Sequence, residues 1–183
     1  MDHQTAAEII ARVLLGDKKA YSLLVDAYQG PLFNLAFRMT GSYADADDLT
    51  QEIFFRAYQQ LRKFNQENHF FTWLYTIGIN LIRNHIKKKT RDAALNAAQG
   101  YSSESQLKKF EEKERDSLPE DRMIMLEKTL RKLPIEVREA IILKYYQNMT
   151  FEEVAAITGD STSAVKMRIY RGLEKIKQTM EKK

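Results

Sequence analysis

The sequence predicts an all-α protein of two small helical domains joined by a flexible linker, the second containing a helix-turn-helix. Apolar residues recur at three- and four-residue intervals through most of the chain, which is the helical period. Residues 93–121 are instead rich in Ala, Ser and mixed charge, so few of them could enter a core. Near the C-terminus, a capping box and a Gly turn precede a basic amphipathic helix. We therefore expect domains at 1–92 and 122–183.

Composition limits the possible classes of protein. The 183 residues include no cysteine, which excludes disulfides and thiolate metal sites and fits a reducing compartment. No run approaches the ~20 apolar residues of a membrane span, and the N-terminus lacks the pattern of a signal peptide. We expect a cytoplasmic protein without membrane insertion.

Charge is distributed unevenly around a net value of +4. Residues 1–55 hold eight acids and four bases, whereas residues 161–183 hold seven bases and two acids. A second basic zone, Arg56 to Arg91, holds eight bases and one acid. Two separate cationic zones predict two contacts with a polyanion such as nucleic acid.

Three short helices are expected first. One stops at Gly16, the next is capped by Asp17 and ends at Gly30–Pro31, and the third runs from Pro31 to Met39. Their predicted apolar faces are, in order, Ala6, Ile9, Ile10, Val13 and Leu14; Ala20, Leu23, Leu24, Ala27 and Tyr28; and Leu32, Phe33, Leu35, Ala36 and Phe37.

A fourth helix, from Ser42 or Ala44 to about Leu61, has two dissimilar faces. One is an apolar stripe: Ala46, Leu49, Ile53, Ala57 and Leu61. The other sets acids beside aromatics: Asp45, Asp47, Asp48, Gln51, Glu52, Phe54, Phe55 and Tyr58. Acids in a first turn complement the helix dipole, but this does not account for the aromatics. Acids beside aromatics are typical of a protein-binding face.

The segment Phe64 to Arg91 is the strongest candidate for binding unpaired bases. A polar loop, Asn65 to His69, precedes a helix expected from about Phe71. Unpaired bases bind where aromatics lie beside a cationic groove, and this segment has both. We assign Trp73 to the core, because clustered aromatics most often bury apolar area. The predicted exposed strip is Thr76, Asn80, Arg83, Asn84 and Lys87.

The second domain is predicted in detail. Two apolar helix faces come first: Met123, Leu126, Leu130 and Leu133, then Val137, Ala140, Ile141 and Tyr145. Thr150 and Glu153 form a capping box for a helix that ends at Gly159. The last helix turns Val165, Ile169, Leu173 and Ile176 inward and its basic residues outward. This arrangement predicts a DNA-binding helix-turn-helix.

Motifs for catalysis are lacking. The sequence has no phosphate-binding Gly loop, no HExxH and no nucleophile setting, and its three histidines have no acid at ligand spacing. We predict no catalytic residues, no metal, no cofactor and no enzymatic activity.

Four stretches together resemble the extracytoplasmic-function (ECF) sigma factors of bacterial RNA polymerase. They are GDKKAYSLLVDAY, DADDLTQEIFFRAY, FFTWLYTIGINLIRNHIKKK and LPIEVREAIILKYYQNMTFEEVAAITGDSTSAVKMRIYRGLEKI. The resemblance implies a first domain that binds core polymerase and opens the minus-ten element, and a second that reads the minus-thirty-five element. It further implies a free monomer, contacts with duplex and single-stranded promoter DNA, and an anti-sigma factor as partner.

Site residues follow from the residue patterns and the resemblance together. Core polymerase is expected at Asp48, Gln51, Glu52 and Phe55. The minus-ten element is expected at Phe64, Asn65, Gln66, Asn68, His69, Asn80, Arg83, Asn84 and Lys87. The minus-thirty-five element is expected at Ser163, Lys166, Met167, Arg168, Tyr170 and Arg171, with Arg168 on phosphate.

The chain departs from common family patterns at three places. Thr76 stands where relatives often have a basic residue, and His69 and Phe70 stand where small or basic residues are frequent. Residues 160–162, Asp-Ser-Thr, replace an apolar residue and Pro. These differences bear on which promoter sequence is read.

Two other classes of protein fit parts of this pattern. A helix-turn-helix regulator with a sensor or dimerisation domain predicts dimers, and leaves the segment from Phe70 to Arg91 without a function. A helical nucleic-acid enzyme would need acid clusters or ligand-spaced histidines.

Overall fold

The computed structural model describes residues 1–65, 67–98 and 120–181, and the secondary structure in these ranges is helical. The first group of helices is α1 (His3–Leu14), η1 (Lys18–Ala20), α2 (Tyr21–Thr40), α3 (Tyr43–Gln60), η2 (Leu61–Lys63) and α4 (Phe70–Ala98). The second group is α5 (Glu120–Arg131), α6 (Ile135–Ile141), a π-helical turn η3 (Ile142–Tyr146), α7 (Phe151–Thr158) and α8 (Thr162–Glu181). The prediction of two helical domains is confirmed.

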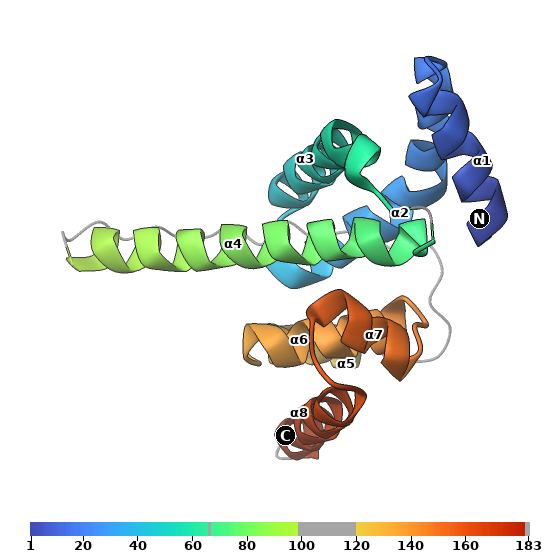
Figure 1. Cartoon of the computed structure of the whole chain (residues 1–183). Helices are drawn as coiled ribbons and strands as arrows, with labels where there is room; N and C mark the ends of the chain where they lie inside the picture. The colour runs from blue at the N-terminus through green and yellow to red at the C-terminus, as the bar shows by residue number, and fades with distance from the viewer. Residues whose placement is uncertain (66, 99–119, 182–183) are drawn as a thin grey trace.

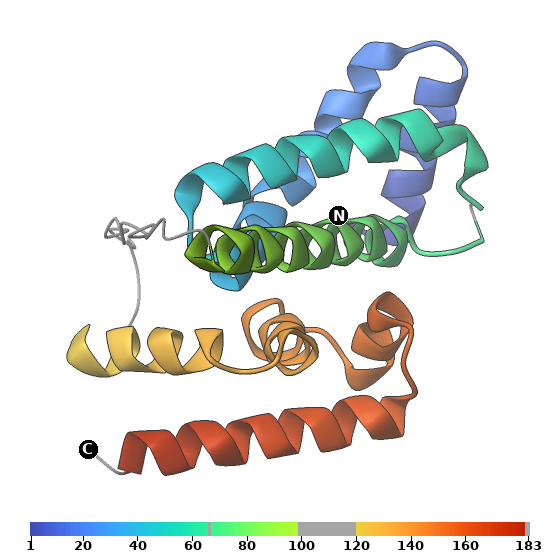
Figure 2. The ribbon, with the colours of Figure 1, turned by 90° about the vertical axis from the view of Figure 1, so that its left-hand side faces the viewer.

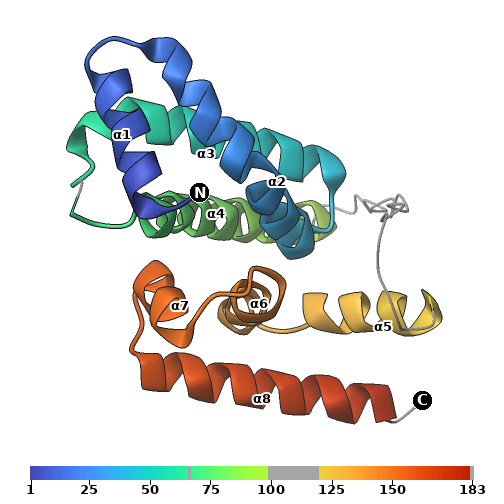
Figure 3. The ribbon, with the colours of Figure 1, turned by 90° about the vertical axis from the view of Figure 1, so that its right-hand side faces the viewer.

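Helix α4 belongs to the first group and lies on the side of it that faces the second group (Figure 1). It packs against α2 and α3 on one side and against α7 on the other. Helix α8 lies on the far side of α5, α6 and α7 from α4, as two opposite views show (Figures 2 and 3). The last helix, α8, is therefore separated from the first domain by the other helices of the second domain.

The core of the first domain forms where periodic apolar faces meet. Its fully buried side chains include Ile10, Leu24, Leu32, Leu35, Met39, Ile53, Leu74, Tyr75 and Ile79. Ser42 caps α3 by accepting a hydrogen bond from the Asp45 backbone N–H at 3.2 Å. Gly41 has a left-handed φ of 74°, which lets the chain turn sharply between α2 and α3.

The expected helix break at Gly30–Pro31 is wrong, because α2 runs through both residues. Proline removes one backbone hydrogen bond but keeps a helix-compatible φ. Leu24, Tyr28 and Leu32 are buried on one face of the continuous helix, and this tertiary packing outweighs the local cost.

Several side chains were assigned to the wrong environment. Leu14, Leu23 and Tyr145 were expected inside but are exposed. Phe54 was expected beside the acids but is buried, and its carbonyl accepts a hydrogen bond from the Tyr21 hydroxyl at 2.8 Å. Each lies at the edge of an apolar stripe, where the neighbouring helix decides burial.

The expected linker contains helical ends. Helix α4 continues to Ala98 and α5 begins at Glu120, so the boundaries at 92 and 122 fall inside helices. The remainder, 99–119, lies outside the described residues.

Candidate nucleic-acid and protein interfaces

The exposed face of α3 carries the four residues predicted to bind a protein. Asp48, Gln51 and Phe55 are exposed, and Glu52 is half-buried. Their spacing of three and four residues places them on one side of the helix. Phe55 is 57% exposed, so this face combines acids with an uncovered aromatic ring, a composition that suits a protein interface.

Two of these four residues, and two further acids of α3, already bind other side chains of the protein. Glu52 accepts a hydrogen bond from Arg56 at 2.6 Å, and Asp47 accepts one from Gln51 at 3.0 Å. Asp45 pairs with Lys89 of α4 at 2.5 Å. Although partial burial works against it, this hydrogen bond holds the pKa of the Asp45 carboxyl below its usual value.

The loop before α4 is anchored by the packing of Phe64 against Phe70 and Trp73. Phe64 is buried and packs against Trp73, with ring centroids 5.0 Å apart, and edge-on against Phe70 at 5.6 Å. Trp73 is half-buried and Tyr75 is buried, in keeping with the assignment of these rings to the core. Phe64 therefore supports the loop and does not present its ring to a ligand.

The polar loop residues that the structure describes, Asn65, Glu67, Asn68 and His69, are exposed. Asn65 orders the turn by accepting hydrogen bonds from the Asn68 backbone N–H at its carbonyl and from the Glu67 backbone N–H at its side chain, both at 3.0 Å. Asn68 and His69 are exposed, and the His69 ring lies 4.5 Å from that of His3. Gln66 lies outside the described residues.

The predicted polar strip of α4 divides in two. Asn80, Asn84 and Lys87 are exposed, as a binding surface requires. Arg83 instead turns toward the second domain and binds the carboxylate of Glu139 through Nε, at 2.6 Å, and through Nη2. Burial raises the pKa of the Glu139 carboxyl, while the hydrogen bond to that carboxylate raises the pKa of Arg83.

The helix-turn-helix of α7 and α8 forms as the capping signals predict. Thr150 and Glu153 make a reciprocal capping box at the start of α7. Gly159 ends α7 with a left-handed φ of 75°. Gly172 lets α8 approach α6 closely, since a Cβ there would lie 2.5 Å from Val137 Cγ1.

The outward face of α8 is largely open. Ser163, Lys166 and Arg171 are exposed, and Met167 and Tyr170 are 52% and 59% exposed. Arg168 differs, because its guanidinium binds Asp160 at 2.5 Å and 3.0 Å. That hydrogen bond lowers the pKa of Asp160.

Sequence reasoning missed a set of contacts between the domains. Arg138 of α6 donates to the Met39 carbonyl at 2.6 Å, and Glu139 binds Arg83 as described. Gln147 accepts from the Tyr75 hydroxyl at 3.0 Å and donates to the Pro31 carbonyl at 3.1 Å. The available signal was the adjacent charged pair Arg138 and Glu139 within an apolar helix.

Two features are absent from the residues that the structure describes. Within them, no group of three or more His, Cys, Asp or Glu is placed to hold a metal ion. Among the same residues, no helix is both long and apolar enough to cross a membrane.

Comparison with known proteins assigns the chain to a family. The model of Sigma-70 region 2 matches residues 24–92, and that of Sigma-70 region 4 matches residues 123–176. The chain is 34% identical over 181 residues to the ECF RNA polymerase sigma factor SigW of Bacillus subtilis, covering 93% of this chain and 94% of that protein. The chain belongs to the ECF sigma factors. It is also 31% identical over 179 residues to the RNA polymerase sigma-H factor of Pseudomonas aeruginosa, covering 95% and 93% of the two chains.

Solved structures agree with this sigma-factor fold. CnrH, solved in complex with the cytosolic domain of CnrY, matches with a TM-score of 0.70 and 26% identity over 96% of both chains. The sigma factor RpoE of Bartonella quintana, solved with the anti-sigma factor NepR, matches with a TM-score of 0.72 and 22% identity, over 89% of this chain and 98% of that one. With Sigma-70 regions 2 and 4 and relatives that are RNA polymerase sigma factors, this chain is a sigma factor that directs promoter-specific transcription initiation.

Proposed function

We propose that this sigma factor uses three separate surfaces during initiation. The exposed face of α3 binds core polymerase, the 64–69 loop and the strip of α4 hold the unpaired minus-ten strand, and the outward face of α8 reads the minus-thirty-five element. The observation that carries the proposal is the exposure of Asn65 and Asn68 in the loop and of Asn80, Asn84 and Lys87 on α4, while the neighbouring rings of Phe64 and Phe70 are buried.

Capture of unpaired bases would open the promoter without ATP. Unpairing costs a few kcal/mol per base, and hydrogen bonds to a captured base edge offset part of that cost. Asn68 offers an amide donor and acceptor for this purpose, whereas the Asn65 amide would have to exchange its hydrogen bonds with Glu67 for bonds to a base. Asn80, Asn84 and Lys87 lie along one side of α4, where they would hold the adjacent strand.

The exposed side chains of α8 are proposed to read the bases of the minus-thirty-five element. Helix-turn-helix proteins place the first turns of their second helix in the major groove. Ser163, Lys166, Met167, Tyr170 and Arg171 occupy those turns and are exposed. Arg168 is partly engaged by Asp160 and suits a phosphate contact that positions the helix.

The partner set follows from these roles. The chain acts as a monomer that joins core polymerase in the cytoplasm and has no catalytic activity of its own. An anti-sigma factor is a further proposed partner, supported by RpoE, which was solved with one bound.

A premelted template tests base capture. Replacing residues 65–68 with Gly and Ser should abolish transcription from duplex promoters, because no side chain remains to hold an unpaired base. Binding to core polymerase should be unchanged, and a template with mismatched minus-ten bases should restore part of the activity. Wild-type permanganate reactivity of the unpaired thymines with the variant would refute the role of the loop.

A double variant tests the polymerase face. Asp48→Ala with Phe55→Ala should weaken binding to core polymerase by roughly 2 to 5 kcal/mol at an unchanged melting temperature. Asp26→Ala, which removes an exposed acid of α2, is the control. Equal affinities for all three proteins would contradict the assignment.

A further inference from the structure

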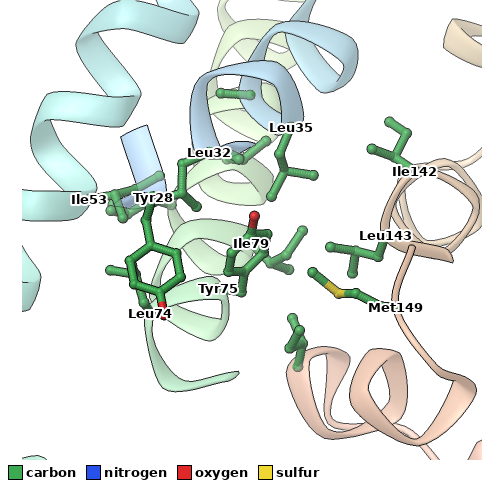
Figure 4. Packing of buried hydrophobic residues seen from close by; sticks show 14 of the residues in the cluster. Tyr28, Leu32, Leu35, Ile53, Leu74, Tyr75, Ile79, Ile142, Leu143 and Met149 are labelled. Carbon is green, nitrogen blue, oxygen red and sulfur yellow. The ribbon is translucent and has the colours of Figure 1, made fainter. Parts of the chain in front are cut away.

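A polar cavity of about 190 Å³ lies where the end of α2, the first turn of α3, α4 and α6 meet. Its polar and charged lining consists of Thr40, Asp45, His85, Lys89, Thr90 and Arg138. In the same contact between the domains, Ile142, Leu143 and Met149 face Leu35 and Ile79, and these five side chains are buried (Figure 4). The cavity therefore gathers polar groups beside an apolar contact.

Two buried nitrogens on the wall of this cavity have no hydrogen-bond partner. They are His85 Nε2 and Arg138 Nε, and both are among the residues that the structure describes. Arg138 is 8% exposed, and its Nη1 and Nη2 already donate to the Met39 and Leu133 carbonyls. His85 Nε2 lies 3.5 Å from Asp45 Oδ1 without forming a hydrogen bond. Because buried polar groups are rarely left unpaired, two such nitrogens on one cavity indicate a site for an acceptor.

The charges of the lining favour an anion. Arg138 and Lys89 are cations, and His85 becomes one when it binds a second proton. Asp45 opposes them, since its carboxylate pairs with Lys89 at 2.5 Å. Although partial burial works against it, this hydrogen bond holds the pKa of the Asp45 carboxyl below its usual value, so the carboxylate is ionised at neutral pH. An anion beside Asp45 must therefore avoid repulsion from a second negative charge.

An oxyanion that keeps an O–H hydrogen meets this requirement, because it can donate that hydrogen to a carboxylate. Two hydroxyls of the lining can also accept it. Thr40 and Thr90 give their own hydroxyl hydrogens to the carbonyls of Ala36 and Ile86, so their oxygens act toward the cavity as acceptors. Hydrogen phosphate carries such a hydrogen near neutral pH, whereas sulfate carries none.

The cavity is accessible to solvent and large enough for a phosphate group. The side chains of His85 and Lys89 are 33% and 61% exposed, so the cavity can be reached along α4. One water needs roughly 10–15 Å³ of such volume, and the cavity exceeds this several-fold.

We propose that this cavity binds a phosphate group that keeps one proton. Arg138 Nε, His85 Nε2 and Lys89 Nζ donate to the phosphate oxygens. Asp45 accepts the hydrogen of the phosphate O–H and thereby selects phosphate over sulfate. The site does not depend on the surfaces assigned above to polymerase and promoter DNA.

Calorimetric titration of the full chain with inorganic phosphate and with sulfate tests this selectivity. At equal ionic strength and slightly below neutral pH, phosphate should bind at least about tenfold more tightly, because a charge-assisted hydrogen bond replaces a repulsion. Phosphate should also raise the melting temperature with increasing concentration, since it binds only the folded chain. If neither ion binds, the two nitrogens are satisfied by water and the proposal is overturned. Equal affinities would overturn it as well, because they would describe an unselective cationic patch.

A histidine variant locates the site. His85→Leu removes one donor and should weaken phosphate binding about tenfold, with the helix content unchanged by circular dichroism. His3→Leu changes an exposed histidine outside the cavity and should bind phosphate as the natural chain does. Undiminished binding by His85→Leu would show that phosphate binds elsewhere.

An amide variant tests the role assigned to Asp45. Asp45→Asn replaces the acceptor carboxylate with an amide that can donate, so sulfate should bind nearly as well as phosphate. A merely structural role, through the pair with Lys89, would lower both affinities and keep their ratio. An unaltered ratio therefore contradicts recognition by Asp45.

Methyl phosphate distinguishes the two sources of a phosphate group. Slightly below neutral pH it still carries a proton in part, as inorganic phosphate does. Binding that is lost in His85→Leu would uphold the site and identify phosphate monoesters as ligands. Exclusion of methyl phosphate by a chain that binds inorganic phosphate would uphold the site for the free ion.

Discussion

Helices α4 and α8 share a pattern of apolar and basic residues but have different surroundings. Both are amphipathic, and both carry bases on the face opposite their apolar stripe. Helix α8 is outermost, and five of its six predicted reading residues are exposed. Helix α4 lies between the domains, and Arg83 of its strip is bound to Glu139. Tertiary packing thus decides which of the two cationic helix faces is left uncovered for a ligand.

Replacing the buried glycine of each helix with alanine should give the largest difference between α4 and α8, measured as protein stability. A Cβ at Gly172 would lie 2.5 Å from Val137 Cγ1 and 2.7 Å from Ile141 Cδ1. Gly172→Ala should therefore cost about 1–3 kcal/mol, even though alanine favours a helix. At Gly78 the nearest atom, Ile53 Cδ1, is 3.3 Å away, so Gly78→Ala should change stability by less than about 1 kcal/mol. Urea unfolding measures both, and equal midpoints would contradict the tighter packing of α8.

Two arginines of α8 should separate base reading from phosphate binding. Arg171 is exposed and free to reach a guanine, so Arg171→Ala should lose about 1–3 kcal/mol of preference at one base pair. Arg168→Ala should weaken binding to all sequences alike. Binding to a set of single-base promoter variants measures this, and an identical loss for both mutants on every site would refute the division.

Salt dependence tests whether the exposed part of α4 meets phosphate. Lys87→Ala should reduce the slope of log affinity against log salt by about 0.7 for single-stranded minus-ten DNA, the value for the loss of one phosphate contact. Lys128→Ala, at an exposed position of α5, should leave the slope unchanged. Titration of labelled DNA at several salt concentrations gives both slopes, and an unaltered slope for Lys87→Ala would remove it from the interface.

The smallest expected effect is the loss of stability in acid, which involves one ion pair made by each helix. Asp45 pairs with Lys89 and Asp160 with Arg168, and both carboxyl pKa values are lowered from 3.8. A lowered pKa stabilises the fold above the unfolded value, and that gain is lost as the pH falls through the folded value. Asp160→Asn should thus cost under about 1 kcal/mol at neutral pH and nothing in strong acid. A loss that persists at low pH would point to a role other than charge pairing.

Local patterns in the sequence determined the helices and most of their faces. The stripe from Ala46 to Leu61 is buried as predicted, and Ser42, Thr150 and Gly159 act as caps. These features depend on neighbours three or four residues away, so periodicity and capping chemistry are enough to predict them. The same is true of the exposed face of α8.

Contacts between distant residues were decided by the tertiary structure. Continuity of α2 through Pro31 depends on burial against neighbouring helices, which outweighs the local preference of proline. Arg83 and Glu139 are 56 residues apart, and the periodicity of its own helix placed Arg83 on an exposed strip. A cation has many possible partners in a sequence, and only the docking of the second domain on α4 selects one and buries it.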